Sequence, residues 1–60
     1  MKHITSHYSA DDIRLAEVHR LDDGTHVVYM FEDGECTNHV YYDLIDDAED
    51  RAEEFVLTAE

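Results

Sequence analysis

The chain has 60 residues, of which 16 are acidic and only four are lysine or arginine, giving a formal net charge of −12 at pH 7. A field of this sign repels nucleic acid and anionic membranes, and it attracts basic surfaces. We therefore expect no direct binding to nucleic acid and no membrane association. Because 43% of the residues are hydrophobic and fall in patterned runs, we expect folding rather than disorder.

The length predicts one small domain over residues 1–60, in which residues 1–12 show no clear period and are a candidate flexible segment. A chain of this size buries only about 60% of its unfolded surface, so a homodimer or a partner complex is a candidate source of stability. The single cysteine, Cys36, excludes an internal disulfide and favours a reducing compartment. The polar N-terminus carries no signal-peptide core, so we expect a cytoplasmic protein.

Asp-Gly dipeptides at 23–24 and 33–34 flank a run rich in valine and aromatic residues. This pattern is the strongest short-range signal for β-hairpins. A two-residue turn at 33–34 would put Val27, Tyr29 and Phe31 on one apolar face of the sheet. The strand pairs expected from that turn are Phe31 with Cys36, Tyr29 with Asn38, and Val27 with Val40.

The preceding segment, 13–21, is ambiguous, and we expect a strand because its apolar residues form no clean helical stripe. A two-residue turn at 23–24 would add Ala16 and Val18 to the apolar face. A three-residue loop would add Leu15 and Leu21 instead, because a one-residue slip exchanges the faces. The alternative is a helix over 10–21, begun by a capping sequence at 9–12.

Residues 46–57 predict a helix, with Asp46 as N-cap and Glu49 completing a capping box. Its apolar stripe comprises Ile45, Ala48, Ala52, Phe55 and Ala59. We expect an α+β fold in which a three-stranded antiparallel meander is followed by this C-terminal helix packed on the sheet (βββα). The alternative is αββα. The predicted core is Val18, Val27, Tyr29, Phe31, Val40, Tyr42, Leu44, Ala48, Ala52 and Phe55.

Five histidines are candidate metal ligands. In the expected register, His19, His26 and His39 share one face and could bind zinc, with Glu17 or Asp43 as a fourth ligand. Scattered surface histidines are the alternative, since no spacing matches a zinc finger. Cys36 is expected to be a small half-buried residue, and the acid pairs serve turns and caps. We therefore expect no enzymatic activity and no cofactor.

Acidic side chains concentrate on the outer faces of the predicted helix and at the 33–34 turn. The predicted partner-binding residues are Asp46, Asp47, Glu49, Asp50, Glu53, Glu54, Asp33 and Glu35. This distribution favours a small regulator or inhibitor that engages a basic surface on a nucleic-acid-handling protein, as a nucleic-acid mimic of the kind that phages or plasmids encode. Val28, Met30 and Tyr41 would form an exposed interface patch. The alternative is a homodimerising or docking module whose acidity reflects solubility or a halophilic source.

Overall fold

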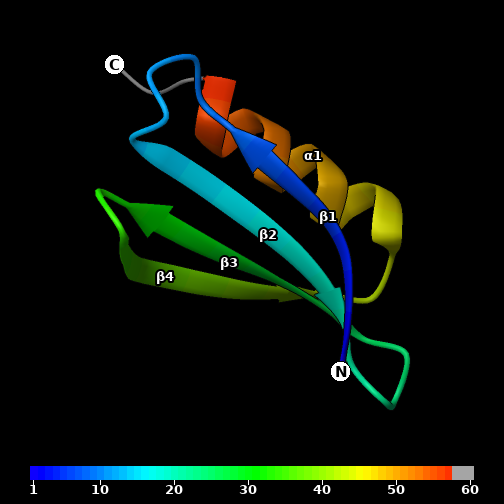
Figure 1. The fold of residues 1–60 in the computed structure, drawn as a ribbon. Helices are drawn as coiled ribbons and strands as arrows, with labels where there is room; N and C mark the ends of the chain where they lie inside the picture. Colours follow the sequence, from blue (N-terminus) through cyan, green and yellow to red (C-terminus); the bar gives the residue numbers. More distant parts are fainter. Residues whose placement is uncertain (58–60) are drawn as a thin grey trace.

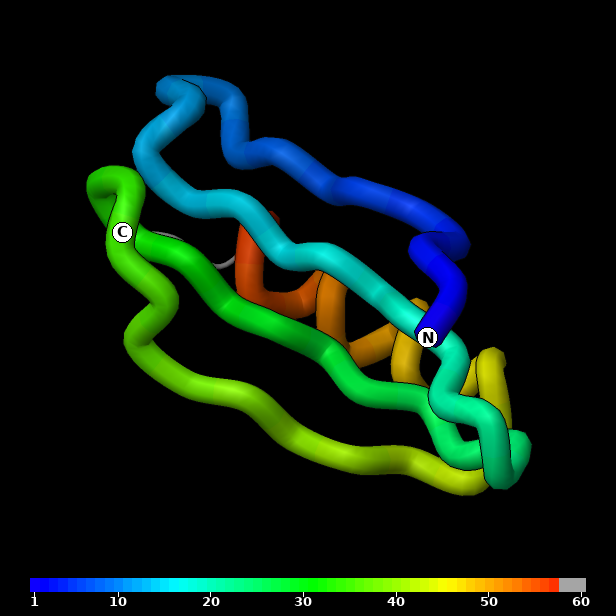
Figure 2. The backbone as a smooth tube through the Cα atoms, turned by 60° about the horizontal axis from the view of Figure 1, so that its bottom comes forward, coloured from blue at the N-terminus to red at the C-terminus, as the bar shows by residue number. Residues whose placement is uncertain are grey.

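The protein folds as a four-stranded antiparallel sheet with one helix packed on it, in a computed structural model that describes residues 1–57. The elements are β1 (Lys2–Tyr8), β2 (Arg14–Arg20), β3 (His26–Glu32), β4 (Glu35–Tyr42) and α1 (Ile45–Leu57). The strands lie in sequence order (Figure 1). In Figure 2 the helix lies behind the strands, so the opposite face of the sheet is uncovered. The α+β class, the meander and the packed C-terminal helix are confirmed.

The N-terminal segment is where the prediction was incomplete. Residues 2–8 form β1 and add a fourth strand, so the expected three-stranded sheet was one strand short. The alternative helix over 10–21 is wrong, because Arg14–Arg20 is a strand. The capping sequence closes a turn instead: the Ser9 hydroxyl donates to Asp11 Oδ1 (2.6 Å) and accepts from the Arg14 amide (3.0 Å).

Both Asp-Gly dipeptides lie in turns, but the two turns differ. Asp33 (φ 55°) and Gly34 (φ 85°) make the expected two-residue turn, since a type I′ turn needs positive φ at both central positions. At the other hairpin, Gly24 has φ 91° and the Leu21 amide donates to the Thr25 carbonyl (2.7 Å). That closure leaves a three-residue loop, so the second of the two predicted loop lengths is confirmed.

A bulge in β4 changes the register that was predicted for the second hairpin. Phe31 pairs with Cys36 as expected, but Met30 already pairs with Asn38, which leaves the residue between Cys36 and Asn38 unpaired. Tyr29 therefore lies opposite His39 rather than Asn38. Likewise Val27 lies opposite Tyr41, and Val40 opposite Val28. The hydroxyl of the extra residue, Thr37, donates a hydrogen bond to the Met30 carbonyl (3.3 Å).

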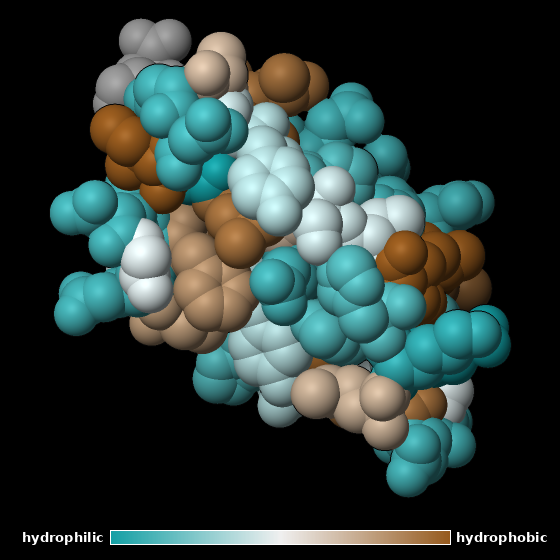
Figure 3. All heavy atoms as spheres, in the orientation of Figure 1, coloured by the Kyte–Doolittle hydropathy of each residue, from teal (hydrophilic) through white to brown (hydrophobic). Residues whose placement is uncertain are grey.

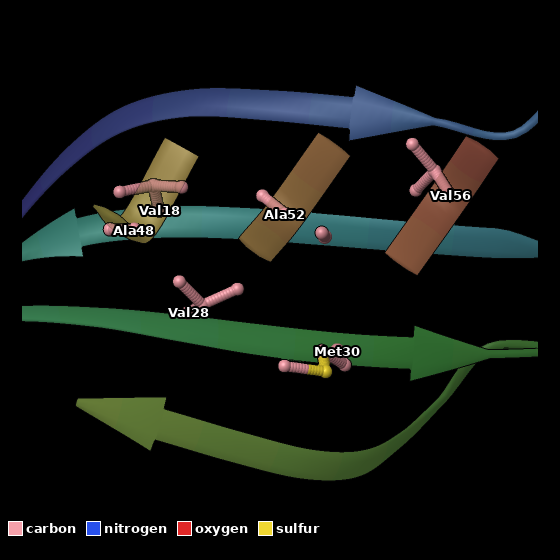
Figure 4. Close-up of a cluster of buried hydrophobic side chains, with 7 residues drawn as sticks. Val18, Val28, Met30, Ala48, Ala52 and Val56 are labelled. Carbon is pink, nitrogen blue, oxygen red and sulfur yellow. The ribbon is translucent and has the colours of Figure 1, made fainter. Parts of the chain in front are cut away.

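The core lies between the helix and one face of β2 and β3 (Figure 4). Its buried members are Ala16, Val18, Val28, Met30, Ala48, Ala52 and Val56, with Ile4, Val40, Tyr42, Ile45 and Phe55 packed against them.

The predicted core is wrong for Tyr29 and Phe31, which occupy the uncovered face, and for Leu44, which is 63% exposed. Val27 is buried but also belongs to the uncovered face. The cause is that α1 covers the Val28 and Met30 side of β3.

The helix begins one residue before the predicted cap. The Ala48 amide donates to the Leu44 carbonyl (3.2 Å), so Asp46 lies inside the first turn and is not the N-cap. Glu49 closes no capping box. Its carboxylate accepts from the Thr5 hydroxyl (2.9 Å) and contacts His7 Nε2 (2.7 Å), which ties α1 to β1.

Ala59, the last residue of the predicted apolar stripe, lies outside the described residues. Within residues 1–57, no helix is long and apolar enough to span a membrane.

Candidate functional site

Rings of histidine and tyrosine cross the uncovered face of the sheet from β1 to β4. Successive ring centroids are 5.0, 5.4, 6.1 and 5.5 Å apart along the series His3, His19, Tyr29, His39 and Tyr41. We call this series the His–Tyr ladder. Three of its four contacts run between neighbouring strands, so the antiparallel pairing of all four strands is needed to assemble it.

At the β1 end of the ladder, four polar side chains make the His–Glu cluster: His3, Ser6, Glu17 and His19. His3 pairs with His19 and Ser6 pairs with Glu17 across β1 and β2. The register shift between His3 and Thr5 puts His3 and Ser6, three residues apart, on the same face. His3 Nε2 contacts Ser6 Oγ (2.8 Å), and His19 Nε2 contacts Glu17 Oε1 (3.0 Å).

The structure does not bring the predicted histidine trio together. His19 and His39 share the uncovered face, but Tyr29 lies between them in the ladder. His26 lies on the helix side, is 4% exposed, and has no hydrogen-bond partner for either ring nitrogen among residues 1–57. The sequence prediction missed His3 because it missed β1. The available signal was the β-forming content of residues 4–8, which contain Ile4, Thr5 and Tyr8.

His26 also lines a shallow hollow of about 430 Å³ at the end of the sheet where α1 begins. The other lining residues are Lys2, His3, Ile4, Arg20 and Ile45. This hollow therefore holds two of the chain's four lysine and arginine residues. Because no ring nitrogen of His26 is exposed to it, the hollow by itself defines no binding chemistry for that imidazole.

The acidic side chains predicted to bind a partner fall into two separated groups. Asp46, Asp47, Asp50, Glu53 and Glu54 are exposed along α1, and the last turn of the helix carries no basic residue. Arg51 pairs with Glu54 (3.1 Å). Asp33 and Glu35 lie at the β3–β4 turn, at the end of the molecule away from the start of α1 (Figure 1). Glu49 is half-buried against β1 and is therefore not part of the exposed acidic surface of α1.

The predicted exposed patch of Val28, Met30 and Tyr41 does not form. Val28 is 0% exposed and Met30 is 1% exposed, because both lie beneath α1. Tyr41 is 53% exposed on the uncovered face, where Tyr29 and Phe31 are half-buried. On the side of the molecule drawn in Figure 3, apolar side chains gather in several groups, one of them at the left of the view, and hydrophilic side chains lie between the groups.

Among residues 1–57, two carboxyl groups have shifted pKa values, and both serve turns. Hydrogen bonds from the Ser9 hydroxyl and the Ile13 amide hold the pKa of Asp11 below its usual value. The backbone and hydroxyl of Thr25 do the same for the pKa of Asp23. Cys36 is exposed rather than half-buried as predicted, and its thiol donates to the Asn38 carbonyl (3.6 Å).

Comparison with known proteins gives no relative: no protein-family model, no curated protein and no solved structure matches the chain. The described residues offer three candidate features for function. They are the acidic surface of α1, the uncovered face with its His–Tyr ladder, and the His–Glu cluster at one end of that ladder.

Proposed function

We propose that the protein is a small acidic binding protein that engages a basic surface on a nucleic-acid-handling partner. The observation that carries the proposal is the stripe of exposed carboxylates along α1. Asp46, Asp50 and Glu53 are spaced four and three residues apart, so they project from one side of the helix over roughly 10 Å. These carboxylates form a row of negative charges on a rigid helix. A protein groove that binds nucleic acid is basic, so the row has the sign of charge that such a groove binds.

Charge also decides how such a complex would form. A net charge of −12 on a chain with four lysine and arginine residues gives a long-range field that speeds encounter with a basic protein. Exposed charges act mainly on the association rate, and salt screens them over about 10 Å at 0.1 M. The proposal therefore requires an association rate that depends on α1 and falls with ionic strength.

The test uses two matched variants that each remove three negative charges. D46N/D50N/E53Q neutralises the α1 stripe, and D12N/D22N/D43N neutralises three exposed acids in the loops. Asp12 has positive φ, a conformation that asparagine also tolerates. Immobilised wild type and both variants would be used to capture basic proteins from an extract of the source cells, followed by mass spectrometry and kinetics with the purified partner.

We expect a nucleic-acid-binding protein on the wild type and on the loop variant, with an association rate constant roughly tenfold lower for the α1 variant at low salt. The difference should shrink at 0.5 M salt. Equal rates for the two variants would refute a role for the α1 stripe. Capture of no basic protein by the wild type would refute the proposal as a whole.

A second candidate function is homodimerisation or docking through the uncovered face, and the half-buried Leu15, Tyr29 and Phe31 on that face favour it. Sedimentation of the wild type, Y41E and L44E separates the possibilities. Tyr41 is exposed on this face, whereas Leu44 is exposed in the β4–α1 connection. A dimer that persists in 1 M salt and is lost only in Y41E supports this function. A monomer at all concentrations rules out the homodimer.

A further inference from the structure

The His–Glu cluster joins three metal-ligating side chains that lie far apart in the sequence. His3, Glu17 and His19 each offer one ligand atom, and these atoms all lie within 4.8 Å of one another. Two structural features bring them together. The β1–β2 register puts His3 opposite His19, and Glu17 is the next residue of β2 on the same face.

We propose that His3, Glu17 and His19 form a Zn²⁺ site on the uncovered face of the sheet. Zinc bonds to imidazole nitrogen and carboxylate oxygen at about 2.0–2.2 Å, so tetrahedral ligands lie roughly 3.3–3.5 Å apart. The Glu17–His19 contact of 3.0 Å is already close to this separation. His3 must move its ring by only about 1.5 Å to complete the site, given the 4.8 Å limit on the present separations.

The side chain that has to move is the one with the fewest constraints. His3 is exposed and stands on β1, an edge strand, where its Nε2 contacts the Ser6 hydroxyl. His19 is half-buried, its ring packs against Tyr29 and its Nε2 contacts Glu17, so its orientation is held without His3. Glu17 and His19 therefore make a preformed pair, and His3 closes onto the ion from the edge of the sheet.

The ligand set also determines which ion the site would take. Two imidazoles and one carboxylate suit zinc and other borderline transition metals, whereas Mg²⁺ prefers an all-oxygen shell. Three protein ligands leave the fourth tetrahedral position to water or to a donor atom from a bound molecule. The net charge of the chain attracts any cation, so selectivity for Zn²⁺ over Mg²⁺ is the property that separates this site from diffuse attraction.

The experiment is calorimetric titration of untagged, metal-free protein with zinc chloride, repeated with magnesium chloride. We expect one Zn²⁺ per chain and no saturable Mg²⁺ binding. H3A and E17Q should each weaken Zn²⁺ binding at least roughly tenfold, because losing a direct ligand should cost no less than losing a partner of one, which costs roughly 10–100-fold. H39A is the matched control, because His39 lies on the same face beyond Tyr29 and should change the affinity less than twofold.

Histidine ring spectra of the wild-type protein give a second readout that needs no variant. Added Zn²⁺ should shift the ring nitrogen signals of His3 and His19 and leave those of His7 and His39 in place. Several results would overturn the proposal: no saturable zinc binding, one zinc per two chains, equal loss of affinity in H39A and H3A, or ring shifts spread over all the histidines.

Discussion

Lysine substitutions at two adjacent positions of β3, made one at a time, test which face of the sheet the helix covers. Met30 lies beneath α1 and is 1% exposed, whereas Phe31 is half-buried on the uncovered face. The variants M30K and F31K add the same charge to the same strand. Any relief of acidic self-repulsion is therefore equal in the two proteins, and only the burial differs.

The structure predicts very different costs. M30K loses about 2–3 kcal/mol of side-chain burial and puts an ammonium group in the core, where desolvation costs several kcal/mol more. A core of this size without disulfides supplies about 3–5 kcal/mol in total, so M30K should be unfolded at 25 °C. F31K loses roughly half the burial of a phenylalanine, about 1–1.5 kcal/mol, and its ammonium reaches water.

Urea unfolding followed by far-ultraviolet circular dichroism shows whether each variant folds and gives the free energy of unfolding of any variant that does. We expect a cooperative transition at a lower urea midpoint for F31K and no folded baseline for M30K. The variant M30A, with an expected loss of about 2–4 kcal/mol, gives a milder version of the same test. A folded M30K beside an unfolded F31K would refute the arrangement described above, because it would place Phe31 rather than Met30 beneath the helix.

Three further predictions concern buried polarity, pH and salt. H26L should raise the free energy of unfolding by about 1 kcal/mol in urea titrations, because the buried ring nitrogens of His26 have no hydrogen-bond partner among residues 1–57. A loss of stability in H26L would show instead that the imidazole is hydrogen-bonded. Asp11 has a lowered pKa, so its stabilising effect is present above about pH 4 and is lost as the pH falls through the folded-state pKa. Urea midpoints of wild type and D11N should accordingly differ at pH 7 and converge in acid, whereas a constant difference would contradict this linkage. The thermal midpoint should rise by several degrees between 20 mM and 1 M salt, and by less in D46N/D50N/E53Q, unless self-repulsion of the acids is negligible.

The amino-acid sequence alone predicted the two Asp-Gly turns, the strands of the two later hairpins and the C-terminal helix. These features depend on short-range causes. Asp33-Gly34 favours positive φ at two successive residues, and residues 45–57 repeat their apolar positions with the period of a helix. The class of fold follows from the order of such elements, which is why the α+β prediction is confirmed.

Contacts between elements far apart in the chain set which face of the sheet is covered and which side chains meet on the other face. Residues 27–31 are apolar or aromatic at every position, so alternation cannot choose between Val28 with Met30 and Tyr29 with Phe31. The bulge at Thr37 then moves Val40 to the helix side. The pairing of His3 with His19 likewise depends on β1, whose polar sequence becomes a strand by hydrogen bonding to β2. Which face of the sheet is buried and which side chains cluster on each face depend on contacts between residues far apart in the chain, and short-range sequence preferences do not predict such contacts.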